Sequence, residues 1–148
     1  MKVVIQRVLN ASVTVDSKII SKINKGLLVL TGVSKDDDFK DADYLIEKIL
    51  NLRIFEDDKG KMNLSLLDIK GEILIVSQFT LLGDTRKGRR PSFDKAAKPD
   101  KAIEIYNYFI EQIKLKGHKT SSGIFGAMMD ISLINNGPVT FVIDSKQF

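Results

Sequence analysis

The pattern of hydrophobic and polar positions in the first third of the chain predicts short β-strands joined by tight turns. β-Branched runs stand at residues 3–5 and 13–15, and a further run at 19–23 leads to the turn Asn24-Lys25-Gly26. Residues 27–33 are almost continuously apolar, which is typical of a strand buried on both faces. The pattern therefore favours a sheet that starts with the first residues of the chain.

Two amphipathic helices are predicted by apolar residues spaced three and four positions apart. The first follows the acidic run Asp36-Asp37-Asp38, which we interpret as a solvated loop that caps the helix. The second begins near Pro99 and ends at the C-cap Gly117, with His118 expected to cap its end, where the helix dipole favours a cation. The expected buried stripes are Ala42, Leu45, Ile46, Ile49 and Leu50, and then Ala102, Ile103, Tyr106, Phe109, Ile110 and Ile113.

The second half of the chain predicts more strands and one long loop. Residues 83–99 show no periodicity, and structureless segments of that length are usually functional. A length of 148 residues suits one domain, so we expect a single α+β domain over residues 1–148 with two main helices and a largely antiparallel sheet. The further strands are expected at 53–55, 62–66, 72–81, 125–134 and 139–143, the last two joined by a tight turn at 135–138.

Composition removes several classes of chemistry. The chain has no Cys and one His, so it has no thiolate nucleophile and no multi-His metal cage, and a Ser–His–Asp triad would depend on His118. We expect no metal and no cofactor. Charge appears too early for a signal peptide, and no apolar run approaches the ~18 residues that span a bilayer. We therefore expect a cytoplasmic protein that does not contact membranes.

Positive charge is concentrated in one part of the chain. The net charge is +4, but residues 86–119 alone hold ten basic and four acidic residues. Four of the basic residues, Arg86, Lys87, Arg89 and Arg90, lie in the segment Asp84-Thr85-Arg86-Lys87-Gly88-Arg89-Arg90-Pro91. They either bind nucleic-acid phosphates or only solvate a loop, and the pattern leaves both interpretations open.

Two other segments contain residues that could form a binding or catalytic site. Ser77-Gln78-Phe79-Thr80 ends the most apolar predicted strand, where side chains and backbone N–H groups can face a ligand, although Ser and Thr are also ordinary strand residues. Asn136-Gly137-Pro138 predicts a turn under any interpretation. Neither segment alone identifies a function.

Together the two segments, in this order and about 55 residues apart, resemble the D-aminoacyl-tRNA deacylase family. The resemblance extends over nearly the whole chain. Its further blocks are Ile5-Gln6-Arg7-Val8, Gly60-Lys61-Met62-Asn63-Leu64-Ser65, Asp84-Thr85-Arg86-Lys87-Gly88-Arg89-Arg90-Pro91-Ser92-Phe93 and Thr120-Ser121-Ser122-Gly123-Ile124-Phe125-Gly126-Ala127.

The resemblance implies a barrel-like homodimer that hydrolyses the ester between a D-amino acid and the 3′ end of tRNA. In the family, a cis Gly–Pro turn of one subunit enters the pocket of the other and excludes L-amino acids. This role carries over to Gly137 and Pro138, and Arg7 matches the residue that braces the turn. The residues that match the pocket floor are Ser77, Gln78, Phe79 and Thr80.

The implied chemistry needs no strong base, because the ester is activated and the ribose 2′-OH beside it can assist proton transfer. We expect backbone N–H groups near Phe79 and Thr80 to stabilise the oxyanion. We expect Thr80 to position water or substrate, because no base is visible that would make it a nucleophile. A filter that acts against an L side chain admits glycine, so glycyl-tRNA is expected to be cleaved as well.

Two positions depart from the family pattern. Met128 stands where the family usually has Asp, and Asn136 replaces a common Asp before the turn. We assign no role to Met128. The alternative interpretation is a non-catalytic RNA-binding dimer of the same fold, which the basic loop fits equally well. The intact Ser77-Gln78-Phe79-Thr80 and Gly137-Pro138 segments favour the enzyme.

Overall fold

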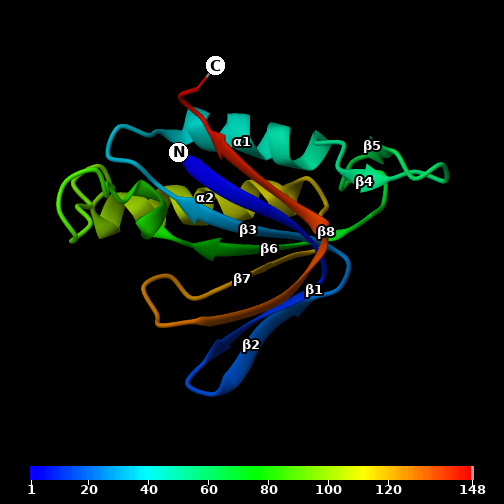
Figure 1. Cartoon of the computed structure of the whole chain (residues 1–148), viewed down its shortest axis with the longest axis horizontal. Coiled ribbons are helices and arrows are strands. Elements are labelled where there is room, and N and C mark those ends of the chain that lie inside the picture. Colours follow the sequence, from blue (N-terminus) through cyan, green and yellow to red (C-terminus); the bar gives the residue numbers. More distant parts are fainter. Residues whose placement is uncertain (148) are drawn as a thin grey trace.

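The computed structural model describes residues 1–147 and shows a strongly curved six-stranded sheet with both helices on one face (Figure 1). A two-stranded hairpin lies outside this sheet. The elements are β1 (Lys2–Val15), β2 (Lys18–Ile23), β3 (Gly26–Gly32), α1 (Phe39–Asn51), β4 (Phe55–Glu56), β5 (Met62–Leu64), β6 (Glu72–Ser77), the 3₁₀ helix η1 (Phe79–Leu82), α2 (Pro99–Leu115), β7 (Thr120–Ser122) and β8 (Asp130–Asp144).

Strand β1 organises the sheet, because β2, β3 and β8 all pair with it in antiparallel register. On the far side of β3 the sheet continues through β6 and β7 as parallel pairs. The sheet curls into a nearly closed, barrel-like shape (Figure 1). The predicted α+β class with two helices is thus confirmed, and the parallel β3–β6–β7 part is the addition that the turn pattern did not indicate.

Both faces of β3 are buried, as its apolar run predicts. Leu27 and Val29 belong to the large cluster between the sheet and the helices, whereas Leu28 belongs to a smaller cluster on the opposite face. The predicted stripe of α1 is entirely buried. The stripe of α2 is buried at Tyr106, Phe109, Ile110 and Ile113, whereas Ala102 is half-buried and Ile103 is exposed. The core therefore forms where the apolar periodicity places it.

Two long strands replace shorter predicted ones. β1 runs unbroken from Lys2 to Val15, because its polar positions pair with β3 and then with β2 instead of forming a turn. The tight turn predicted at residues 135–138 does not separate two strands, because residues 130–144 form the single strand β8. Asn135 is paired with Val8 and Thr140 with Gln6, so the residues between them form a bulge within β8.

Smaller corrections concern the ends of other elements. The strands predicted at 53–55 and 62–66 shrink to β4 and β5, and residues 125–129 precede β8 without joining it. Strand β7 was not predicted, because Thr120-Ser121-Ser122 carries no apolar alternation. The loop predicted at 83–99 is confirmed up to residue 98, where α2 follows, and it makes two isolated backbone bridges, Asp84 with Ser92 and Ala96 with Ser34.

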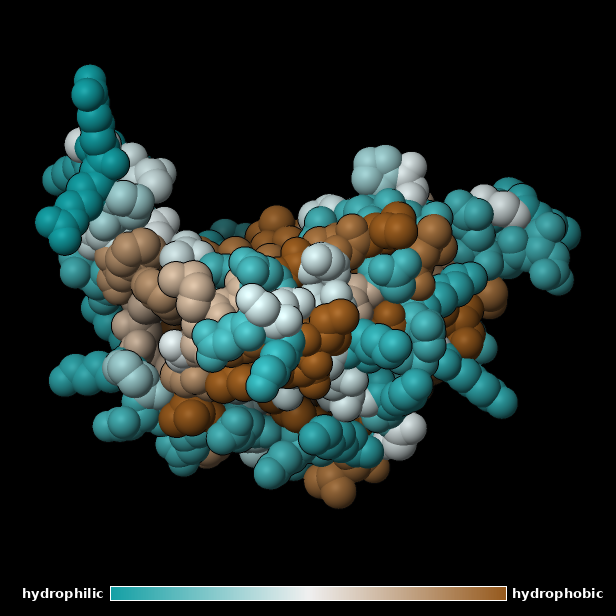
Figure 2. Space-filling view, turned by 90° about the horizontal axis from the view of Figure 1, so that it is seen from below, coloured by the Kyte–Doolittle hydropathy of each residue, from teal (hydrophilic) through white to brown (hydrophobic). Residues whose placement is uncertain are grey.

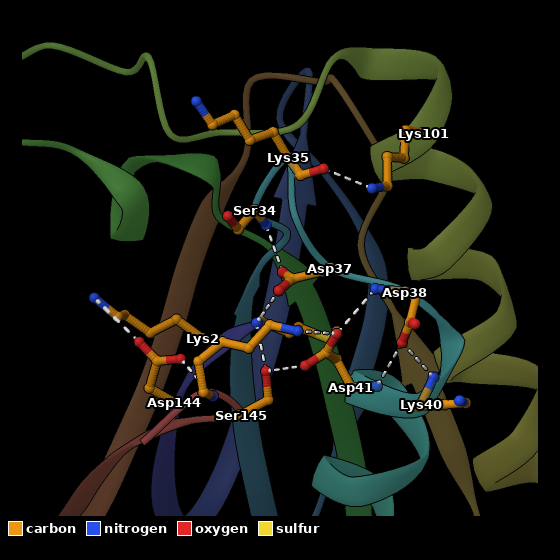
Figure 3. Close-up of polar contacts among 12 residues, drawn as sticks. Lys2, Ser34, Lys35, Asp37, Asp38, Lys40, Asp41, Lys101, Asp144 and Ser145 are labelled. Atoms are coloured by element: carbon orange, nitrogen blue, oxygen red, sulfur yellow. Dashed lines mark hydrogen bonds and ion pairs between the residues drawn. The ribbon is translucent and has the colours of Figure 1, made fainter. Parts of the chain in front are cut away.

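The acidic run before α1 has a structural role beyond the predicted cap. Asp38 is the N-cap and forms a capping box with Asp41, which confirms the cap. Asp37 is instead buried and accepts a hydrogen bond from the α-ammonium group of Met1 at 2.5 Å. The same ammonium donates to Ser145, whose hydroxyl donates to Asp41, so this network joins β1, α1 and the segment after β8 (Figure 3).

Candidate functional site

A cavity of about 810 Å³ opens beside the carboxyl end of β6. One wall comes from the ends of β3 and β6, another from the start of α2, and a third from the segment between β7 and β8. Its polar lining includes Thr31, Ser77, Gln78 and Thr80, and its apolar lining includes Phe79 and Phe93. All four residues that match the family's pocket floor therefore line one cavity.

The segment Ser77-Gln78-Phe79-Thr80 leaves the sheet at the cavity, which corrects the predicted strand 72–81. The backbone N–H of Gln78 donates to the carbonyl of Thr31 at 2.7 Å and is the last link to β3. From Phe79 the chain turns into η1. The N–H groups of Phe79 and Thr80 stand at the start of this turn and have no hydrogen-bond acceptor within residues 1–147.

Tyr106 on α2 holds the end of β6 at this point. β7 ends at Ser122, level with Ile75, so Ser77 has no neighbouring strand on that side. The buried Tyr106 hydroxyl donates to the carbonyl of Ile75 at 2.9 Å and accepts from the N–H of Ser77, and burial raises the pKa of this hydroxyl. A side chain thus takes the place of a strand where the cavity begins.

The Thr80 hydroxyl has an amide, and not a base, beside it. Its Oγ1 accepts a hydrogen bond from Nε2 of Gln78 at 2.5 Å. No carboxylate or imidazole within residues 1–147 is hydrogen-bonded to it. Phe79, 56% exposed, contacts Phe93 edge to face with ring centroids 5.0 Å apart, so two aromatic rings form part of the cavity wall.

The Gly137-Pro138 segment forms the tip of the bulge in β8. The peptide bond between the two residues is cis, and both residues are exposed. Gly137 has φ +137, and a Cβ there would lie 2.7 Å from Val139 Cγ2 and 3.0 Å from Arg7 Nη2. The side chain of Asn135 closes the bulge by accepting from the N–H of Val139 at 2.7 Å. The bulge therefore requires glycine at this position.

Arg7 braces this bulge from beneath, as the resemblance implies. Its side chain is buried, and Nε donates to the carbonyl of Asn136 at 2.8 Å while Nη1 donates to the carbonyl of Ile54 at 2.7 Å. Glu56 lies 3.7 Å from Nη2 and provides a counter-charge. The fork of one guanidinium thus ties the bulge to the start of the β4–β5 hairpin.

The cavity and the bulge lie at the levels of opposite ends of β3, because Thr31 lines the cavity and Leu27 is registered with Arg7 beneath the bulge. Ser77 is registered with Thr31, which is registered with Val3, whereas the bulge stands opposite Arg7. Arg7 is four steps along β1 from Val3, or about 13 Å at ~3.3 Å per residue. Gly137 and Pro138 are not among the residues that line the cavity of their own chain. The predicted site residues thus form two groups.

The basic loop projects beyond η1 and is closed by two backbone hydrogen bonds between Asp84 and Ser92. Arg86 is already paired within the loop. Its guanidinium forms a bidentate ion pair with the carboxylate of Asp84 and lowers the pKa of that carboxyl. Lys87, Arg89 and Arg90 are exposed and have no ionic partner among residues 1–147. Three of the four predicted phosphate ligands are therefore free.

His118 does not cap α2 as a cation. The helix ends at Leu115, three residues earlier, and Nε2 of His118 is buried without a hydrogen-bond partner within the described chain. Burial and the charge of Lys116 lower the pKa of this imidazole. The expectation of a charged cap is therefore wrong.

Several residues that form or position the cavity were not anticipated from the sequence. Thr31 lies inside an apolar strand, and Tyr106 lies in the apolar stripe of α2, so both resembled core residues. Met128, which stands at a family Asp position, is 90% exposed and lines the cavity.

Neither helix of residues 1–147 is long and apolar enough to cross a membrane.

The chain is similar to known proteins over almost its whole length. The family model described as D-Tyr-tRNA(Tyr) deacylase covers residues 4–144. A D-aminoacyl-tRNA deacylase of Thermosipho melanesiensis is 61% identical over 148 residues, 99% of both chains, and one of Bacillus velezensis is 56% identical over 147 residues, 99% of this chain and 100% of the other.

Solved structures share the fold. The c-Myc DNA unwinding element binding protein superposes with a TM-score of 0.91 at 44% identity, covering 97% of this chain and 98% of the other. A probable eukaryotic D-amino acid tRNA deacylase gives a TM-score of 0.80 at 19% identity, covering 96% and 97%. The family model and the curated relatives place the chain among hydrolases that act on aminoacyl-tRNA. The chain belongs to the D-aminoacyl-tRNA deacylase family.

Proposed function

We propose that residues 1–148 act as one domain, in a homodimer, that removes D-amino acids from tRNA at sites shared between the subunits. The observation that carries this proposal is the separation of the cavity from the exposed Gly137-Pro138 bulge in one chain. A bulge that cannot reach its own cavity can enter that of a second copy. The carbonyl groups of the bulge then face the α-carbon of the substrate, where they leave no room for an L side chain.

Exposed apolar side chains on the outer surface support association of two copies. Large apolar side chains on β1, β2 and β8 are exposed to solvent in the single chain. Apolar patches are visible on the face that Figure 2 shows. Burial of such side chains in a symmetric pair is the usual way to form a homodimer. The side chains are Leu9, Ile19, Ile20, Ile134, Phe141 and Val142.

In the proposed reaction, water adds to the ester carbonyl, and the developing oxyanion is stabilised by the free N–H groups of Phe79 and Thr80. The bond from the carbonyl carbon to the ribose oxygen then breaks, and the departing oxygen receives a proton with help from the adjacent 2′-OH. Thr80 keeps its hydroxyl and orders water or substrate, because Gln78 already donates a hydrogen bond to it. The products are tRNA and the free D-amino acid.

Two properties of the substrate follow from this design. Glycyl-tRNA carries no side chain for the bulge to exclude, so the enzyme cleaves it as well. The exposed Lys87, Arg89 and Arg90 attract the tRNA backbone from the loop beside the cavity. Aminoacylated tRNA is used in translation, so we place this activity in the cytoplasm.

A deacylation assay tests the activity. Purified protein is incubated with D-tyrosyl-, L-tyrosyl- and glycyl-tRNA, and loss of the ester is followed over time. We expect D-tyrosyl- and glycyl-tRNA to be cleaved and L-tyrosyl-tRNA to survive. If tRNA is bound but no D-selective cleavage occurs, the protein is a non-catalytic RNA-binding dimer of the same fold, and the proposal is wrong.

Mixed dimers test the shared site. Gly137→Ala distorts the bulge, whereas Ala102→Trp places a large side chain in the cavity from its wall at the start of α2. Each homodimer should be inactive, but a mixed dimer contains one site built from an intact cavity and an intact bulge. We expect co-expression to restore up to about half of the activity per mixed dimer. A monomeric protein in light scattering, or no restoration, would exclude a site shared in this way.

A further inference from the structure

Thr31 is a polar residue in an unusual place. It belongs to β3, whose other side chains form the two apolar cores, and only 1% of it is exposed. Its Oγ1 is buried and has no hydrogen-bond partner within residues 1–147. A buried hydroxyl without a partner destabilises the folded protein, so such a group needs an explanation.

The position of Thr31 supplies one, because the residue lines the cavity. It is registered with Ser77 in the parallel β3–β6 pair, so the two side chains point to the same face of the sheet. The wall on that side continues through Val33, Ala97 and Ala102, which are apolar. Beside these apolar side chains, the hydroxyls of Thr31 and Ser77 are the side-chain groups on that face of the cavity that can donate or accept a hydrogen bond.

We infer that the Thr31 hydroxyl binds the aminoacylated 3′ end of the substrate, through a hydrogen bond to a polar group of either the terminal nucleoside or the aminoacyl unit. This inference rests on the proposed function and adds a binding residue to it. Thr31 holds the substrate and takes no part in bond breaking. Its effect therefore falls on KM and on equilibrium binding, while kcat stays close to that of the wild type.

The isosteric variant Thr31→Val separates binding from folding. It removes an unpartnered hydroxyl and keeps the shape, so the thermal midpoint should stay the same or rise slightly. We expect KM for D-tyrosyl-tRNA to rise about 3- to 10-fold, the range for one neutral hydrogen bond. Thr31→Ser keeps the hydroxyl and should restore KM to within about 2-fold of the wild type.

Ser21 on β2 provides a matched control. Its Oγ is also buried without a partner, but the residue does not line the cavity. Ser21→Ala should leave KM unchanged. If KM of Thr31→Val equals that of the wild type, or if Thr31→Ser raises KM as much as Thr31→Val does, the hydroxyl does not bind substrate and the inference is wrong.

Two non-hydrolysable ligands distinguish the sources of the hydrogen bond without relying on turnover. The probes are 3′-amino-3′-deoxyadenosine and its D-alanyl amide, each titrated by calorimetry. If Thr31→Val weakens both, Thr31 binds the nucleoside; if it weakens only the amide, Thr31 binds the aminoacyl unit. Unchanged affinity for both overturns the inference, whereas a wild-type protein that binds the amide but lacks D-selective cleavage contradicts the proposed function instead.

Discussion

The Tyr106 hydroxyl donates a hydrogen bond of 2.9 Å to the carbonyl of Ile75, at the level where β7 ends and β6 continues with β3 as its one neighbouring strand. That carbonyl also accepts a hydrogen bond from the N–H of Gly123, just after β7, at 3.0 Å. One carbonyl oxygen thus accepts both the last hydrogen bond from the β7 side and the hydrogen bond from Tyr106. The cavity opens just beyond this point, because no strand covers the following residues. Tyr106 therefore positions the backbone of the site without lining it.

Removal of this hydroxyl should affect both stability and rate. In Tyr106→Phe the N–H of Ser77 loses its acceptor, which should lower the free energy of unfolding by about 1–2 kcal/mol. Because the backbone of Phe79 shifts with Ser77, we expect kcat to fall several-fold with a smaller change in KM. Tyr108→Phe on the same helix removes a hydroxyl that bonds to the exposed carboxylate of Asp43, and it should leave kcat unchanged. Equal effects of both variants on kcat would contradict a positioning role.

Thr80→Ala distinguishes positioning from nucleophilic catalysis. Because Oγ1 accepts from Gln78 and has no base beside it, we expect the single-turnover rate with D-tyrosyl-tRNA to fall by no more than about 10-fold. Loss of a true nucleophile costs about 10⁴-fold or more. A loss of that size would mean that Thr80 forms a covalent intermediate. Thr85→Ala in the exposed loop is the control and should have the wild-type rate.

The basic loop predicts a specific dependence of tRNA binding on salt. Each lost phosphate contact reduces, by ~0.7–0.9, the steepness with which the logarithm of the tRNA association constant falls with the logarithm of the salt concentration. We expect the triple variant Lys87→Ala/Arg89→Ala/Arg90→Ala to lose about 2 units of slope. Arg86→Ala should lose less, because Arg86 is already paired with Asp84. Identical slopes for the wild type and the triple variant would show that the loop is only solvated.

The sequence predicts the core of this protein better than it predicts the site. Apolar periodicity places α1, α2 and the buried β3 correctly, because burial of side chains is a local pattern repeated along each element. The bulge at Gly137 was expected to be a tight turn between two separate strands, since the sequence does not show that β1 pairs on both sides of it. The position of Tyr106 matters because β7 ends at Ser122, and the place of Thr31 in the cavity wall depends on its pairing with Ser77; no local pattern encodes either fact.

The same holds for the network around Asp41, which joins segments 104 residues apart and yields a prediction about acid stability. Burial raises the pKa of the Asp41 carboxyl, but hydrogen bonds from Lys146, the backbone of Asp38 and Ser145 outweigh this effect and bring it to about 2, below the ordinary value of 3.8 (Figure 3). A carboxyl whose pKa is lower in the folded state stabilises the fold above its unfolded pKa. This contribution, roughly 2 kcal/mol, is lost as the pH falls from about 4 through 2.

Asp41→Asn removes the titrating group and isolates the contribution. At pH 7 the variant should be less stable than the wild type in urea unfolding, and the gap should narrow by roughly 2 kcal/mol between pH 5 and pH 2 as the wild-type carboxyl takes up its proton. Asp58→Asn, in the exposed turn after β4, should keep the wild-type profile. A gap between Asp41→Asn and the wild type that stays constant over this range would mean that Asp41 stabilises the fold through the hydrogen bonds of its side chain and not through its charge.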